Sequence, residues 1–208
     1  MDLTKLTQMQ KDALREIGNI GAGNAATSMS KLVNRKIDMD VPTVNIVSFD
    51  EMMERIGGPE SIVVALLFRI QGDAPGTVYF IFSIEEAEAL IKEITNNDAL
   101  RLDVNDELAI SVIQEAGNIV TGAYLSALGD FTNITMQPSV PYLSIDMAGA
   151  ILTVGLLEVS QVADYALIID AKISSSYQVS QIKGNFLFIP DPDSFSKLFK
   201  ALGVTNDV

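Results

Sequence analysis

Residues 16–42 decide the fold, and they read EIGNIGAGNAATSMSKLVNRKIDMDVP. Residues 115–141 read EAGNIVTGAYLSALGDFTNITMQPSVP and align with them, without a gap, at a shift of 99 residues. Eight of the 27 aligned positions are identical, namely Glu16/Glu115, Gly18/Gly117, Asn19/Asn118, Ile20/Ile119, Gly23/Gly122, Asn34/Asn133, Val41/Val140 and Pro42/Pro141. A gapless match of this length that includes rare residue types indicates an internal duplication rather than coincidence in a Gly- and Ala-rich helix.

The same elements are expected in both halves. Apolar residues at helical spacing predict long helices over residues 8–33 and 106–130, the second capped by Asn105. Apolar runs bounded by Gly and Pro predict strands, and a shorter amphipathic helix follows each pair of strands. These strands are expected at residues 61–70, 77–82, 166–173 and 182–189, and the short helices are expected to begin near Ser83 and Asp191.

This pattern predicts an α/β (α+β) fold with internal pseudo-twofold symmetry. We expect one domain over residues 1–208, made of two repeats at about 7–96 and 105–203. The halves would share a mostly antiparallel sheet, with the long helices on one side. Residues 78–82 are apolar on both strand faces, which predicts a central strand. Residues 147–159 fit a helix and a strand equally well.

Composition excludes several kinds of chemistry. The 208 residues include no cysteine and no histidine, so zinc sites built from these residues and all Ser-His or Cys-His catalytic schemes are impossible. The net charge of −13 argues against nucleic acid and anionic membrane surfaces as partners. No apolar run approaches the ~20 residues of a membrane helix. We expect a cytoplasmic protein without a metal or cofactor of its own.

Polar residues form a stripe along each long helix. At about 100° per residue, Asp12, Glu16 and Asn19 fall within an arc of about 60° on the first helix. Their counterparts on the second helix are Ser111, Glu115 and Asn118. The opposite faces are largely apolar or small, and they consist of Leu14, Gly18, Gly21, Ala25 and Leu32, and of Ile113, Gly117, Val120, Tyr124 and Phe131. We therefore expect both polar stripes to face solvent.

The stripes contain residues that do not favour a helix. Asn is a mediocre helix former, and each mid-helix Gly costs about 1 kcal/mol relative to Ala. Because the same residues recur in both copies, we interpret them as functional rather than as ordinary solvated charges beside a helix kink. The segment 21–26, GAGNAA, imitates a dinucleotide-binding fingerprint, but a helical pattern precedes it where that fingerprint needs a strand.

The two motifs resemble those of the CheC, CheX and FliY phosphatases of bacterial chemotaxis. The shared pattern is Asp or Ser, three residues, Glu, two residues, Asn, twenty-two residues and Pro. The first copy matches with Asp12, Glu16, Asn19 and Pro42, and the second with Ser111, Glu115, Asn118 and Pro141. Two copies without additional segments are most similar to the CheC type, and the resemblance covers nearly the whole chain.

The resemblance implies hydrolysis of the aspartyl phosphate on phospho-CheY, the response regulator of the flagellar motor. Asn19 and Asn118 would orient the attacking water, while Glu16 and Glu115 would pair with a cation of the partner. Asp12 and Ser111 would support docking. Mg²⁺ is expected in the site of the partner rather than in this chain, which we expect to be a monomer.

The resemblance also implies binding of CheD, a receptor-modifying deamidase, through a segment that includes Asp146 and Met147. Two other functions stay open on the sequence. One is a non-catalytic module that sequesters CheD or phospho-CheY. The other is a component of the flagellar switch.

Overall fold

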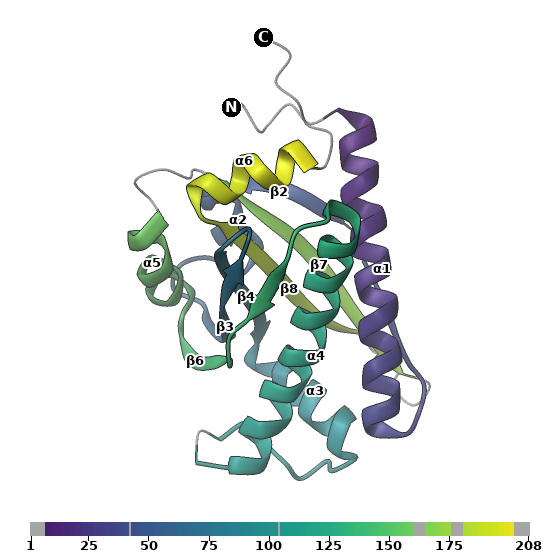
Figure 1. Cartoon of the computed structure of the whole chain (residues 1–208). Helices are drawn as coiled ribbons and strands as arrows, with labels where there is room; N and C mark the ends of the chain where they lie inside the picture. Colours follow the sequence, from purple (N-terminus) through teal and green to yellow (C-terminus); the bar gives the residue numbers. More distant parts are fainter. Residues whose placement is uncertain (1–6, 42, 104, 160–164, 176–180, 202–208) are drawn as a thin grey trace.

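The computed structural model describes residues 7–41, 43–103, 105–159, 165–175 and 181–201. In these residues each half contributes three helices and four strands in the same order. Figure 1 colours them along the chain. The first half contains α1 (Gln8–Val33), β1 (Ile37–Asp40), β2 (Val44–Ser48), α2 (Phe49–Arg55), β3 (Ile62–Gly72), β4 (Gly76–Ser83) and α3 (Ile84–Thr95). The second contains α4 (Glu107–Thr132), β5 (Met136–Pro138), β6 (Tyr142–Met147), α5 (Ala148–Val159), β7 (Tyr165–Ser175), β8 (Ile182–Pro190) and α6 (Pro192–Ala201).

Strands from both halves form one antiparallel sheet, as predicted. The described strands make an eight-stranded sheet in the order β1-β7-β8-β4-β3-β5, in which β2 also pairs with β7 and β6 also pairs with β3. The central pair is β4 and β8, one from each half, and the same arrangement of strands extends from both sides of this pair. This is the arrangement that a pseudo-twofold axis between β4 and β8 would generate.

The strands are buried on both faces, and two apolar cores result. One core lies between the sheet and the helices α1, α3 and α4, where it includes Phe68, Phe80 and Phe188. The other lies on the opposite face, where Met52 of α2 and Leu152 of α5 pack against strand residues. The long helices therefore share one side of the sheet. The prediction that residues 78–82 form a central strand is confirmed, because all five are buried in β4.

Two local expectations need adjustment. The ambiguous residues 147–159 form α5, apart from Met147, which ends β6. The helix α4 is capped by Asp106 rather than Asn105, because the Asp106 Oδ1 accepts hydrogen bonds from the N–H groups of Leu108 and Ala109. A neighbouring residue of the preferred capping type displaced the predicted cap.

The ends of the long helices explain one of the repeated identities. Asn34 and Asn133 each follow the last residue of a long helix and have positive φ angles of 51° and 60°. Asn adopts this left-handed conformation more readily than most residues, which is why it ends both helices. In the described part of the chain, no helix is both long and apolar enough to cross a membrane.

Candidate functional site

The two long helices lie side by side and antiparallel on the sheet (Figure 1). They are in close contact at Gly21 of α1, where an added Cβ would lie 3.0 Å from Tyr124 Cε1 and 3.1 Å from Tyr124 Cα. Small residues on α1 thus admit a bulky ring from α4. The Tyr124 ring also packs on Phe186 of β8, at a centroid distance of 4.8 Å.

The predicted buried faces are correct except at their C-terminal ends. Leu14, Gly18, Gly21 and Ala25 on α1 are buried, as are their counterparts Ile113, Gly117, Val120 and Tyr124 on α4. By contrast, Leu32 and Phe131 are each 48% exposed, so their prediction as buried residues is wrong. Both lie in the last turn of a helix, where no described element covers that side.

The candidate site residues lie on the solvent-facing sides of these helices, as expected. Glu16, Asn19, Glu115 and Asn118 are all exposed. Within the described part of the chain, none of their side chains has a hydrogen-bond or ion-pair partner. Four polar groups are therefore presented to solvent with their hydrogen-bonding capacity free for another molecule.

The supporting residues Asp12 and Ser111 are exposed as well. Asp12 is held in place, because its Oδ1 accepts a hydrogen bond of 3.1 Å from Gln8 and lies 3.3 Å from the Arg15 guanidinium. Pro42 lies outside the described residues, whereas Pro141 is buried just before β6.

The Asp or Ser, the Glu and the Asn of each motif lie on one helix, and the structure does not bring the two motifs together. Both motifs occupy the first half of their helix, and the helices are antiparallel, so the motifs lie toward opposite ends of the pair (Figure 1). The chain thus offers two separate sites of the same composition. Among the described residues, no group of three or more acidic side chains is placed to hold a metal ion.

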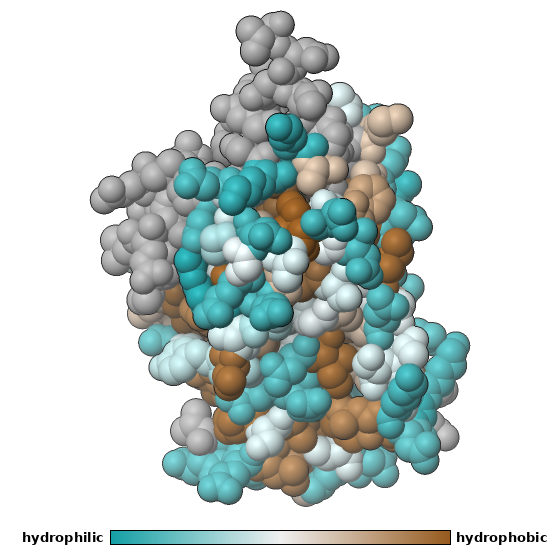
Figure 2. Space-filling model, in the orientation of Figure 1, coloured by the Kyte–Doolittle hydropathy of each residue, from teal (hydrophilic) through white to brown (hydrophobic). Residues whose placement is uncertain are grey.

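Apolar residues beside the motifs were missed in the sequence. Met9 is 82% exposed and its counterpart Leu108 is 56% exposed, while Ile20 is 44% exposed. Figure 2 shows the side seen in Figure 1, where hydrophilic and hydrophobic residues are interspersed over the long helices. Extending the 99-residue alignment toward the N-terminus would have paired Met9 with Leu108 and revealed an exposed apolar position in both copies.

The second candidate surface, around Asp146 and Met147, lies at the end of β6. Both residues are exposed, and the Asp146 Oδ1 accepts a hydrogen bond of 2.7 Å from the Met147 N–H. Beside them is a pocket of about 280 Å³ between β6, β3 and α5. It is lined by Ala65, Leu67, Tyr142, Ser144, Asp146, Ala150 and Ile151.

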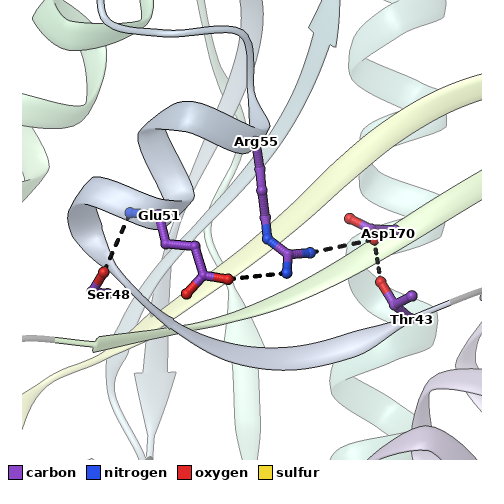
Figure 3. Close-up of polar contacts among 5 residues, drawn as sticks. All are labelled: Thr43, Ser48, Glu51, Arg55 and Asp170. Atoms are coloured by element: carbon purple, nitrogen blue, oxygen red, sulfur yellow. Dashed lines mark hydrogen bonds and ion pairs between the residues drawn. The ribbon is translucent and has the colours of Figure 1, made fainter.

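The corresponding place in the first half holds a cluster of polar contacts (Figure 3). Thr43 Oγ1 donates a hydrogen bond to Asp170 Oδ2, and the Arg55 guanidinium lies 3.9 Å from the same oxygen. Arg55 also donates to Glu51 at 3.1 Å. Thr43 and Asp170 correspond to Tyr142 and Leu67, so the pseudo-symmetric partner of an ion-pair cluster is a mostly apolar pocket.

The sequence pattern of the CheC-like family matches residues 9–46 and 108–145, which contain both motifs. The chain is 41% identical over 202 residues to the CheY-P phosphatase CheC of Bacillus subtilis, covering 96% of this chain and 97% of that protein. It belongs to the CheC-like family.

A second relative resembles the chain in sequence, and a solved structure resembles it in fold. The flagellar motor switch phosphatase FliY of Bacillus subtilis is 25% identical over 145 residues, covering 69% of this chain and 38% of FliY. The crystal structure of Thermotoga maritima FliY superposes with a TM-score of 0.73 at 20% identity, covering 95% of this chain and 98% of that one. The latter comparison shows a shared fold.

Proposed function

We propose that this protein is a phosphatase that hydrolyses the aspartyl phosphate of the response regulator CheY in bacterial chemotaxis. The observation that carries the proposal is the pair of exposed Glu/Asn motifs, one at the same place on each long helix, whose side chains have no partner among the described residues. Its extensive identity to a protein named as a CheY-P phosphatase supports the same activity.

The proposed chemistry needs an amide rather than a nucleophile from this chain. A carboxamide carries both a donor and an acceptor, so Asn19 or Asn118 can hold a water molecule in line with the phosphorus. The water attacks phosphorus, the bond between phosphorus and the aspartyl oxygen breaks, and inorganic phosphate and a carboxylate are released. The water-positioning glutamine of GTPases has a comparable role.

The acidic residues of the same stripe would bind the surface of phospho-CheY. Glu16 and Glu115 lie one helical turn before the Asn residues, and each would pair with a cation beside the partner's phosphorylation site. Asp12, already oriented by Gln8 and Arg15, would accept further hydrogen bonds, and Ser111 has the same position in the second copy. The Mg²⁺ that phospho-CheY requires would belong to the partner.

Phosphate release from purified phospho-CheY tests this proposal. The double variant Asn19→Ala/Asn118→Ala should lose at least ~100-fold in rate, as expected when the water is no longer positioned, with an unchanged circular dichroism spectrum. Asn19→Ala alone should keep the activity of the second motif, and Asn118→Ala alone should keep that of the first. Asn24→Ala is the matched control, because Asn24 is an exposed asparagine of α1 outside the stripe. Full activity in the double variant would reject the catalytic role.

The same variants separate catalysis from sequestration. A non-catalytic module would bind phospho-CheY without accelerating its hydrolysis, and the double Asn variant would then behave like the parent protein in every assay. The flagellar-switch alternative predicts co-purification with motor basal bodies. We propose a cytoplasmic monomer, which sedimentation analysis of the purified chain would test.

We also propose that CheD docks at the pocket beside Asp146 and Met147. The observation that favours this second role is the contrast between the two halves, because the equivalent place in the first half holds the charged side chains of Arg55 and Asp170. Asp146→Lys should abolish binding of CheD in a pull-down and leave phosphate release unchanged. Asp98→Lys, in an exposed loop, is the control. If Asp146→Lys still binds CheD, the docking site lies elsewhere on the protein.

A further inference from the structure

The glycines of the long helices fall into two groups. A Cβ at Gly18 would lie 3.1 Å from side-chain atoms of Val41 and Val44, and a Cβ at Gly117 would lie 3.3 Å from Phe68 Cζ. Gly21 is restricted by Tyr124 in the same way. Internal packing therefore accounts for these glycines, whose Cα atoms approach neighbouring elements.

Gly23 and Gly122 have no such explanation. Apart from the adjacent backbone of its own helix, a Cβ at either position would meet no atom within 4 Å. Both lie inside 26-residue helices, where Gly disfavours the helix relative to Ala. The two positions are equivalent by the 99-residue shift, so both copies keep the same unfavourable residue although the described fold does not require it.

Their place on the helix connects them to the candidate site. Gly23 lies one turn beyond Asn19, at about 40° around the helix, and Glu16 lies at about 60° on the same side. Gly122 has the same relation to Asn118 and Glu115. A groove of about 1020 Å³ also begins at Gly23 and runs between the C-terminal half of α1 and β1, so there is open space next to this glycine.

Exposed apolar residues border the same face in both copies. Met9 and Ile20 lie at about 80° and 100° from Asn19, next to Glu16. On α4 the equivalent positions hold Leu108, which is exposed, and Ile119, which is partly buried against the core. Large apolar side chains next to charged and amide groups are typical of protein contact surfaces, whereas a small phosphorylated molecule would reach the Asn alone.

We infer that Gly23 and Gly122 are close-contact positions for the substrate protein, where bare helix backbone admits the rim of its phosphorylation pocket. Met9 and Ile20, with Leu108 and Ile119 in the second copy, complete this contact face. The inference rests on the proposed function and deepens it, since it assigns specificity for a folded receiver protein whose aspartyl phosphate lies in a recess. A Cβ on either glycine would hold the partner away and leave the Asn amide too far from the phosphorus.

The test uses the full chain in an Asn118→Ala background, which leaves only the first copy active. Gly23→Ala and Gly23→Leu are compared with the parent for binding of CheY locked by beryllofluoride and Mg²⁺, and for phosphate release. We expect binding to weaken by ~10-fold or more for Leu and less for Ala, which follows the added volume. KM should rise more than kcat falls. Gly23→Ala should melt at a higher temperature, because Ala favours the helix.

Ser28→Leu is the matched control, because Ser28 is exposed on α1 at about 180° from Asn19. It should bind and hydrolyse like the background variant. Unchanged binding and turnover by both Gly23 variants would overturn the inference and leave the phosphatase proposal intact. Absence of phosphate release by the parent protein would instead reject the proposed function. If Gly23→Leu fails to fold, the helix-favouring Gly23→Ala decides the outcome.

Discussion

Gly21 of α1 packs against the ring and the backbone of Tyr124 of α4, and this contact joins the two halves of the duplicated chain. A Cβ on Gly21 would lie 3.1 Å from Tyr124 Cα, a backbone atom that cannot move without displacing α4. A side chain at position 21 would therefore push the two site-bearing helices apart. The contact also makes the residues at this crossing sensitive to small changes in volume.

Gly21→Ala should therefore destabilise the protein. We expect the free energy of unfolding to fall by about 1–3 kcal/mol through overpacking, although Ala is the better helix former by about 1 kcal/mol. Urea denaturation measures the change. Gly23→Ala, two residues away on the open side, is the control and should raise stability. Equal effects of the two substitutions would contradict the packing role of Gly21.

Tyr124→Phe should leave the protein as stable as the parent at pH 7, or more stable. The hydroxyl is buried and has no hydrogen-bond partner among the described residues, so its removal ends a desolvation cost of about 1–3 kcal/mol. The ring contacts with Gly21 and Phe186 stay. Thermal unfolding would measure the change, and a loss of several degrees would show that the hydroxyl has a partner after all.

The same residue predicts a pH effect. Burial raises the pKa of Tyr124 above its ordinary value of 10.0. The unfolded chain therefore releases this proton above about pH 10 while the folded protein retains it, so stability is full below that pH and falls as the pH rises. Tyr124→Phe should lose less stability than the parent between pH 9 and pH 11, measured by urea denaturation, because the other tyrosines titrate in both proteins. Parallel pH profiles would count against this account.

Glu16→Gln/Glu115→Gln should weaken binding of the substrate more than the chemical step. Removing the two carboxylates eliminates the proposed ion pairs and leaves the Asn amides in place, so KM should rise several-fold with a smaller change in kcat. Because salt screens exposed charges, the KM of the parent should rise between 50 and 500 mM NaCl, and the KM of the variant should rise less. Identical salt dependence would show that these carboxylates do not contact a cation.

Arg35 and Glu93 should contribute to the stability of the fold only when both charges are present. Arg35 Nη2 lies 3.1 Å from Glu93 Oε1, and Glu93 is buried on α3, although the two atoms are not aligned as a hydrogen bond. Arg35→Met would leave a buried carboxylate unpaired and should cost roughly 3 kcal/mol or more. The double variant Arg35→Met/Glu93→Leu should recover much of that loss in urea denaturation. A double variant no more stable than Arg35→Met would show that the charges are not coupled.

Local sequence patterns predicted the elements well where one period dominated. The apolar period of α1 gave both of its bounds, and the continuous apolar run of β4 gave its central place. The pattern failed at Leu32 and Phe131, because helical spacing assigns a side to a residue but does not say where the neighbouring element ends. It left α5 undecided, since a short and mostly apolar run fits both periods.

The sequence by itself determined the duplication, the two helix faces and the Glu/Asn motif on each exposed face. These follow from spacing along the chain, and a helix turns spacing into direction without help from distant residues. Only the tertiary structure decided which glycines are packed and which are open, and which half carries the pocket beside Tyr142 rather than the contacts of Asp170. Those properties depend on residues that are far apart in sequence and meet only when the two halves share one sheet.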